Sequence, residues 1–318
     1  MLGSVILIVI GFAMLIIGAN WLVDGSSNVA KKFHIPEIII GLTIVSIGTS
    51  MPELFVSLTS ALEGFPDMAV GNVVGSNVAN LLLILGMSAI INSIAFKRET
   101  RLIEIPICLF VSILFMVICN IGQDVSRIDA TILLVAFVAF IIYTIIMAKK
   151  GEEFEKNETI EDKKEIKKTS TLKDIIAIIL GVILLKVGGD FTVDNAVKIA
   201  NMFNWSEKLI SVTILAVGTS LPELGTSVSA AFKGNSDIAI GNILGSNIFN
   251  MLFIIGTSAL ISPITYNISY NRDMIILLVA TVVLALFPAI PPKNKMSRMN
   301  GTIYLALYIG YLAMLFVM

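Results

Sequence analysis

The sequence predicts an all-α polytopic membrane protein, with ten transmembrane helices arranged as two inverted five-helix repeats. Three observations lead to this fold class. Of the 318 residues, 56% are apolar and only 14% are charged, a balance outside the usual range of soluble domains. Apolar runs of about 20 residues, enough to cross roughly 30 Å of hydrocarbon, recur along the chain. Finally, the two halves of the chain repeat one another at a fixed shift.

The apolar runs give ten candidate spans. Their approximate positions are 3–23, 36–62, 68–92, 102–122, 128–148, 174–200, 207–231, 237–261, 273–292 and 299–317. The first run lacks a basic region and a small-residue cleavage site, so we expect a retained span rather than a signal peptide. Lysine and arginine in short loops mark the cytoplasmic side. They follow the odd-numbered spans, at 31–32, 97–101, 149–173 and 293–298. Both termini are therefore expected outside the cell, in a protein of the cell membrane.

The internal repeat defines the expected organisation. "GTSMPEL" at Gly48 matches "GTSLPEL" at Gly218, and the same ungapped shift places "DMAVGNVVGSN" from Asp67 on "DIAIGNILGSN" from Asp237. Each half holds an odd number of spans, so the second half enters the membrane from the opposite side. We expect a first repeat over 1–148, a cytoplasmic linker over 149–173 and a second repeat over 174–318. The strongest similarity covers about 36–92 and 207–261.

Polar residues interrupt the repeated spans at matching positions, a pattern typical of secondary transporters with a site near the membrane midplane. On a helix, Glu53 lies one turn from Thr49 and Ser50, so the three side chains can share a face. Pro52 removes a backbone N–H and disfavours helical geometry at Met51, which is expected to free carbonyl oxygens near 46–48.

The following span carries a polar stripe on an otherwise apolar helix. Asn72, Ser76 and Asn80 are spaced four residues apart, and the second half repeats them as Asn242, Ser246 and Asn250. Because no cysteine or histidine belongs to this set, the oxygen ligands favour calcium and sodium over softer transition metals. Two glutamates match a divalent charge. A doubly ionised site must carry cations or protons before it crosses the membrane, which couples one ion to another.

The paired "GTS(M/L)PEL" and "GN(V/I)(V/L)GSN" segments resemble the alpha repeats of the cation/calcium exchanger superfamily, particularly its prokaryotic sodium/calcium exchangers. The similarity extends over essentially the whole chain. It implies that Glu53 and Glu223 are the principal calcium ligands, helped by the backbone carbonyls of Thr49 and Thr219. It also implies sodium sites that combine these glutamates with hydroxyls and carbonyls of Ser50, Ser220, Ser76, Ser246, Ser46 and Ala216.

The resemblance further implies an electrogenic antiporter that exchanges three sodium ions for one calcium ion and extrudes calcium, while its first and sixth spans slide as a gating pair. Asn80 and Asn250 join the candidate ligands. Potassium-dependent relatives carry aspartate there, so the amides argue against potassium cotransport. We expect no cofactor, no enzymatic activity and no nucleic-acid partner. The expected partners are the transported ions and the lipid bilayer, and the expected form is a monomer.

Other functions stay open on the sequence alone. The nearest is calcium/proton antiport, in which the glutamates would release protons to calcium; the repeated hydroxyls favour sodium. An intramembrane hydrolase is suggested only by "GGD" at 188–190, without a second aspartate motif or a nucleophile with its base. An ion channel is conceivable, but a fully inverted repeat favours alternating access.

Several polar residues outside the site have two readings each. Lys186 in the sixth span can pair with Asp190 one turn later, or serve in gating. His34 can cap a helix or sense protons. Asp67 and Asp237 can cap helices or recruit ions at the mouth of the site. Cys108 and Cys119 are expected to be buried without a disulfide.

Overall fold

A computed structural model of the chain describes residues 2–63, 66–157, 170–203 and 216–317. Its first half is built from helices joined by short loops and two very short strands. In chain order these elements are α1 (Leu2–Lys32), α2 (Glu37–Ile40), η1 (Gly41–Val45), α3 (Ser46–Thr49), α4 (Met51–Leu62), α5 (Pro66–Ala79), η2 (Asn80–Ile84), α6 (Leu85–Ile91), β1 (Ile94–Ala95), η3 (Thr100–Glu104), α7 (Ile105–Asn120), β2 (Asp124–Val125) and α8 (Arg127–Asn157).

The second half follows a closely similar order. It consists of α9 (Thr171–Met202), α11 (Ala216–Gly218), α12 (Leu221–Phe232), α13 (Ser236–Phe249), η5 (Asn250–Ile254), α14 (Ile255–Ile261), β3 (Ile264–Thr265), η6 (Ile268–Tyr270), α15 (Asn271–Leu286), η7 (Phe287–Ala289), β4 (Lys295–Met296) and α16 (Arg298–Val317). Helices α8 and α9 extend into the linker expected over 149–173, because its many glutamates and lysines are good helix formers. Residues 158–169 of that linker and residues 207–215 of the expected seventh span lie outside the described residues.

The helices confirm a polytopic membrane fold. Within the described ranges, seven helices are long and apolar enough to cross a bilayer, and the bent pair formed by Glu37–Thr49 and Met51–Leu62 makes an eighth. Helix α16 adds 20 residues at the end of the chain. The total of ten spans and the inversion of the second half stay predictions.

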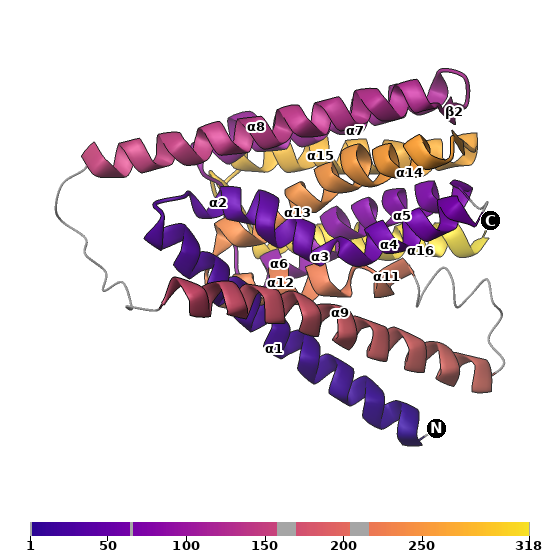
Figure 1. Cartoon of the computed structure of the whole chain (residues 1–318), viewed down its shortest axis with the longest axis horizontal. Helices are drawn as coiled ribbons and strands as arrows, with labels where there is room; N and C mark the ends of the chain where they lie inside the picture. The colour runs from indigo at the N-terminus through magenta and orange to yellow at the C-terminus, as the bar shows by residue number, and fades with distance from the viewer. Residues whose placement is uncertain (1, 64–65, 158–169, 204–215, 318) are drawn as a thin grey trace.

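The helices are arranged with two spans at the centre and others around them (Figure 1). Each span has a most hydropathic stretch, and the buried share of that stretch differs between spans. It is 94% in Ser236–Ile261 and 72% in Met68–Ile91, but only 22–28% in α1, α8 and α9. Figure 1 shows α8 along one side of the molecule and the α1–α9 pair along the other. The continuous core therefore follows the two central spans, which carry the repeated polar stripe.

Helices α1 and α9 pack against each other in antiparallel directions through small residues. Gly11 lies against Gly188, Gly18 against Gly181 and Gly25 against the Asp174 carbonyl. A Cβ atom added to Gly18 would lie 2.8 Å from the Gly181 carbonyl oxygen. Small residues of this kind let helix backbones approach closely in a membrane. The pair is also joined at one end, where the Asn28 amide donates to Asp174 at 3.0 Å.

Two short strand pairs, absent from the all-α prediction, link the two halves at opposite ends of the helices. Strands β1 and β4 are antiparallel, with Ile94 opposite Met296. Strands β2 and β3 are also antiparallel, with Val125 opposite Ile264. Each strand has only two residues, which is too short for an alternating pattern to be recognised in the sequence. Helix α1 begins and α16 ends toward the end that holds β2 (Figure 1).

The helix starts decide one of the alternative readings. Residue His34 has φ of 54°, and Pro36, two residues later, occupies the cap position of α2; the role of the His34 side chain stays a prediction. Capping by Asp237 is wrong, because Asn235 accepts from the N–H of Ile238 at 3.1 Å. Asp237 instead pairs with Lys97 at 2.5 Å.

Two of the remaining readings agree with the structure. Lys186 and Asp190 form the expected ion pair, with 2.5 Å between their charged atoms. Cys108 and Cys119 are buried and free. The side chain of Asp67 lies outside the described part, so its role stays a prediction.

Candidate ion-binding site

A break in the repeated helix places the first part of the site. Helix α3 ends at Thr49, and Ser50 leaves helical geometry with φ −84° and ψ 10° before α4 begins. The helices on either side of the break are bent by 49°. Ser220 has nearly the same conformation, φ −87° and ψ 8°, before α12. Because Pro52 and Pro222 fit the first turn of the new helices, the break falls one residue before the expected Met51.

The break also leaves a backbone carbonyl without its usual partner. In a continuous helix, the N–H of residue 52 would donate to the carbonyl of Gly48, but Pro52 has no N–H to donate. Pro222 removes the equivalent donor to Gly218. By contrast, the carbonyl of Ser46 accepts from the Ser50 N–H at 3.0 Å and from the Thr49 hydroxyl at 3.2 Å. The sequence led us to expect freed carbonyl oxygens near 46–48. Within that segment, Gly48 is the residue whose carbonyl loses its helical donor.

The two glutamates are held by serines from the opposite halves of the chain. Ser50 donates to Oε1 of Glu223 at 2.7 Å, and Ser220 donates to Oε1 of Glu53 at 3.3 Å. Both glutamates are only 1% exposed. The "GTS(M/L)PE" segments of the two repeats therefore meet in one buried cluster, rather than forming two separate sites.

Asparagines of the central spans brace the backbone next to each glutamate. Asn72 donates to the Glu53 carbonyl at 3.2 Å and to Ser57 at 3.0 Å. Asn242 repeats this arrangement, with 3.4 Å to the Glu223 carbonyl and 2.9 Å to Ser227. Thr49 also donates to the Asn242 side-chain oxygen at 3.0 Å. Each polar stripe thus begins with a residue that fixes the position of a glutamate.

Four asparagine amides join the central spans to each other further along the stripes. Asn80 donates to the side-chain oxygen of Asn247 at 3.0 Å, and Asn250 donates to that of Asn77 at 2.9 Å. Asn80 and Asn250 also open the π-helical turns η2 and η5. Such turns often occur at functional sites, because they change the direction in which a side chain points.

Eight buried side-chain oxygens around these contacts have no hydrogen-bond partner among the residues that the structure describes. They are Glu53 Oε2, Glu223 Oε2, Ser76 Oγ, Ser246 Oγ, Asn80 Oδ1, Asn250 Oδ1, Thr219 Oγ1 and Thr226 Oγ1. Buried polar atoms normally have a partner, and a cation would satisfy oxygens of this kind. Within the described ranges, no three carboxylates, histidines or cysteines are grouped to hold a metal. The oxygens without a partner thus belong to two carboxylates and to neutral hydroxyl and amide groups.

The structure brings most of the predicted ligands into this region. Ser46, Thr49, Ser50 and Ser220 are buried at or before the breaks, and Thr219 precedes Ser220. Ser76 and Ser246 are buried on the central spans, whereas Ala216 is the first residue of α11. The sequence reasoning did not single out Asn77 and Asn247, or the serines Ser57 and Ser227. Their recurrence at the repeat shift was the signal that could have identified them.

Comparison with known proteins places this geometry in a family. The profile described as "Sodium/calcium exchanger protein" matches residues 3–146 and 173–317, which is most of the chain. The chain belongs to the sodium/calcium exchanger family. This confirms membership of the cation/calcium exchanger superfamily, whose members are transporters rather than enzymes. The chain is therefore a multi-pass membrane antiporter.

Curated exchangers align with this family member over nearly its full length. The putative antiporter CaxA of Alkalimonas amylolytica is 36% identical, with 99% of each protein covered. The sodium/calcium exchanger MaX1 of Methanosarcina acetivorans is 28% identical, with 98% of each covered. A more distant relative, the Ca2+/H+ antiporter ChaA of Bacillus subtilis, is 22% identical over 85% of this chain and 80% of its own length. The names of MaX1 and ChaA thus give different coupling ions, sodium and the proton.

A solved structure has the same fold as this exchanger. The sodium-calcium exchanger NCX_Mj, soaked with zero Na+ and Ca2+, superposes with a TM-score of 0.83 and 31% sequence identity, covering 98% of each chain. The resemblance therefore includes the whole helical arrangement and is not limited to the repeated motifs.

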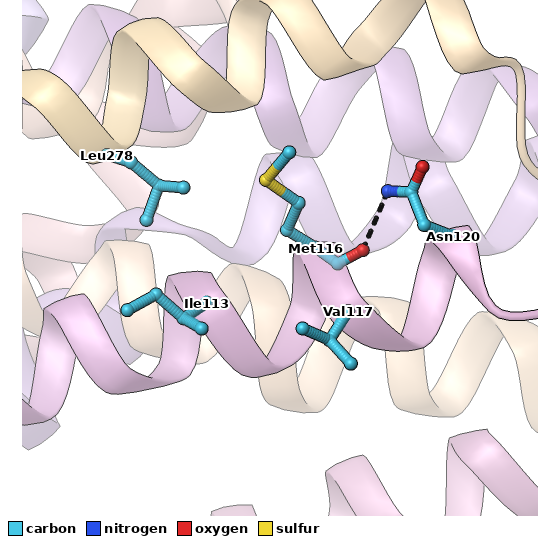
Figure 2. Close-up of a pocket in the computed structure, with 5 residues that line it drawn as sticks. All are labelled: Ile113, Met116, Val117, Asn120 and Leu278. Carbon is cyan, nitrogen blue, oxygen red and sulfur yellow. Dashed lines mark hydrogen bonds between the residues drawn. The ribbon is translucent and has the colours of Figure 1, made fainter.

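A surface pocket elsewhere in the exchanger is unsuited to ions. Figure 2 shows this pocket between α7 and α15, lined by Ile113, Met116, Val117, Asn120 and Leu278. The amide of Asn120 donates to the Met116 carbonyl at 2.8 Å. Because four of the five lining side chains are apolar and none is charged, we assign no ion-binding role to this pocket.

Proposed function

We propose that the protein is a sodium/calcium antiporter that extrudes calcium, with Glu53 and Glu223 as the principal calcium ligands. The observation that carries this proposal is the reciprocal contact of each glutamate with a serine of the other half. Each carboxylate keeps a second buried oxygen without a partner in the described structure. Calcium prefers six to eight oxygen ligands and accepts carboxylates, so it suits this cluster.

Sodium would use the neutral oxygens around the same glutamates. Ser50 and Ser220 already contact the carboxylates, while Ser76 and Ser246 present free buried hydroxyl oxygens. We also assign to sodium the backbone carbonyls of Ser46 and Ala216. Thr49 and Thr219 would contribute their carbonyls to calcium. Since both ions need the same two carboxylates, sodium binding favours calcium release, which is the coupling that an antiporter requires.

The expected exchange of three sodium ions for one calcium ion moves one net charge. A membrane potential contributes about 2.3 kcal/mol per elementary charge for each 100 mV. A tenfold sodium gradient contributes about 1.4 kcal/mol per ion. Both terms favour calcium extrusion when sodium is higher outside and the cell interior is negative.

The proposed topology has ten spans in two inverted halves, with both termini outside. The end of α1 carries Lys31 and Lys32, and Lys31 pairs with Glu37 at 3.8 Å. The charge of Glu37 also acts on Lys97, so these lysines lie toward the same end of the molecule. We assign this end to the cytoplasm because lysine-rich short loops remain there. The exposed α1–α9 pair would move across the buried centre during alternating access.

Calcium/proton antiport is the second candidate, because ChaA aligns with this chain as a Ca2+/H+ antiporter. In that mechanism, protons instead of sodium would neutralise Glu53 and Glu223 after calcium leaves. The free hydroxyl oxygens of Ser76 and Ser246 favour sodium, because proton coupling does not require additional oxygen ligands.

Calcium uptake into proteoliposomes tests the two mechanisms. Purified protein is reconstituted into vesicles loaded with sodium, with potassium or with acid, and radiolabelled calcium uptake is followed. We expect uptake only from sodium-loaded vesicles, and its loss in Glu53→Gln and Glu223→Gln. Uptake driven by acid alone would assign the protein to calcium/proton antiport. Uptake from every vesicle type would exclude antiport.

A further inference from the structure

Two asparagines outside the predicted ligand set occupy the crossing of the central spans. Asn77 and Asn247 are fully buried and occupy equivalent positions of the two repeats. The Asn77 amide donates to the backbone carbonyl of Asn247 at 3.3 Å, and the Asn247 amide donates to the backbone carbonyl of Asn77 at the same distance. The two helices are therefore joined by a reciprocal pair of bonds.

These bonds determine which way the next amides must point. A backbone carbonyl can only accept, so Asn77 and Asn247 must turn their NH2 groups toward each other's backbone. Their side-chain oxygens then face Asn250 and Asn80. Because those oxygens can only accept, Asn250 and Asn80 must present their NH2 groups, at 2.9 Å and 3.0 Å. The side-chain carbonyl oxygens of Asn80 and Asn250 consequently have no hydrogen-bond partner among the described residues.

The free oxygens lie on the same stripes as the residues that hold the glutamates. Asn80 follows Ser76 by one helical turn and Asn72 by two, and Asn72 bonds the Glu53 carbonyl. The π-helical turn η2, which begins at Asn80, packs against α12, the helix of Glu223. The turn η5, which begins at Asn250, packs against α4, the helix of Glu53. Each of these amide oxygens thus lies on a π-helical turn that packs against the helix of a glutamate.

We propose that Asn77 and Asn247 are positioning residues, which orient Asn250 and Asn80 so that their amide oxygens, not their NH2 groups, face the transported ions. An NH2 group in that position would repel a cation. If the amide of Asn80 or Asn250 were reversed, its oxygen would face the side-chain oxygen of Asn247 or Asn77. The chain thus presents two neutral oxygens beside two carboxylates. This inference rests on the proposed function, because it assumes that the glutamate cluster binds sodium and calcium.

The strongest expected effect is on sodium. Calcium has its charge matched by the two carboxylates, whereas monovalent ions depend more on neutral oxygens. Loss of an outer residue that orients a ligand typically weakens metal binding by about 10- to 100-fold. We expect Asn247→Leu to weaken sodium binding about 10-fold, at the lower end of that range, and to weaken calcium binding much less.

Calorimetric titration of purified protein with sodium and with calcium, combined with a double-variant cycle, tests this role. If Asn247 acts through Asn80, Asn247→Leu should add little to the sodium defect of Asn80→Leu. The matched comparison is Asn247→Leu with Asn250→Leu, because Asn250 is held by Asn77; these two defects should combine. If Asn247→Leu does not fold, Asn247→Ser is used, since its hydroxyl is too short to reach Asn80.

The outcomes separate the failure of this inference from that of the proposed function. If the unaltered protein binds neither ion, the proposed function fails first. If the unaltered protein binds both ions and Asn247→Leu and Asn247→Ser bind them equally well, Asn247 is not a positioning residue. A lower thermal stability with unchanged sodium affinity would also overturn the proposal, because it would show a purely structural role.

Discussion

The central spans and the outer α1–α9 pair use the membrane environment in opposite ways. In the centre, 94% of the most hydropathic window within Ser236–Ile261 is buried, and polar side chains form cross-repeat hydrogen bonds. In α1 only 22% of the corresponding window is buried, and the α1–α9 pair is held largely by glycine contacts. The centre is thus fixed by directional bonds, which glycine packing does not provide.

This difference separates two kinds of variant. Changes in the centre alter the distances between oxygen atoms and should change ion affinity. We expect changes in the outer pair to leave those distances unaltered and to change the rate at which the site opens. The following predictions are ordered from the largest expected effect to the smallest.

The first prediction removes a brace from the centre. Asn242→Leu deletes the bonds to the Glu223 carbonyl and to Ser227, and leaves Thr49 without its acceptor on Asn242. We expect calcium affinity to fall about 10-fold or more, as for other residues that orient metal ligands. Calcium dependence of transport measures this. The control is Asn195→Leu on α9, whose amide donates to the Phe191 carbonyl of its own helix. An equal affinity loss in both variants would contradict the assignment.

The second prediction crowds the central helix crossing. A Cβ at Gly245 would lie 2.6 Å from both the Leu42 carbonyl oxygen and the Ser46 hydroxyl. Gly245→Val should therefore destabilise the protein by about 1–3 kcal/mol, the usual cost of overpacking. Gly310 on α16 is exposed, and a Cβ there meets no atom of the described residues within 4 Å. Thermal unfolding in detergent should show a much smaller loss for Gly310→Val; equal losses would exclude crowding as the cause.

The third prediction concerns the outer pair. A Cβ at Gly181 would lie 2.8 Å from the Gly18 carbonyl oxygen, whereas a Cβ at Gly189 on the same helix meets no atom of the described residues within 4 Å. Gly181→Ala should lower the maximal transport rate several-fold while calcium affinity stays unchanged, because the ion ligands lie elsewhere. Gly189→Ala serves as the control. A shift in calcium affinity for Gly181→Ala would remove the proposed separation between affinity and rate.

The fourth and smallest effect concerns the Lys97–Asp237 pair outside the hydrophobic centre. Partial burial lowers the pKa of Lys97, but the hydrogen bond and charge of Asp237 outweigh it, so the pKa is raised. The pair therefore stabilises the fold below the ordinary lysine pKa of about 10.4, and this contribution is lost as the pH rises through the higher folded value.

Lys97→Gln should lower the unfolding free energy by at most about 1 kcal/mol at pH 7, because Lys97 is largely exposed. At a pH well above the folded-state pKa of Lys97, the variant and the unaltered protein should have similar stability. Chemical unfolding at both pH values provides the comparison. A stability difference that persists undiminished at the higher pH would show that the charge pair is not its source.

The sequence predicted which residues meet in one buried cluster better than it predicted their individual contacts. The repeated "GTS(M/L)PE" motif identified Glu53 and Glu223 because carboxylates and a proline are costly within apolar spans. The break at Ser50 was missed by one residue, since the first helical turn tolerates proline. Asn77 and Asn247 were missed because their role depends on a contact between distant segments. Asp237 resembled a helix cap until the structure placed Lys97 beside it.

The most direct test of the account is calcium titration of the purified protein by calorimetry, with Glu53→Gln, Glu223→Gln and the double variant. Glu104→Gln is the control, because Glu104 is as buried as the two glutamates but bonds Tyr143 instead. We predict that the unaltered protein and the Glu104→Gln control bind one calcium ion per chain with the same affinity. Each single glutamate variant should lose this binding, with the calcium affinity reduced about 100-fold or more. Two independent calcium sites, each lost in only one of the single variants, would contradict a single site built from both repeats.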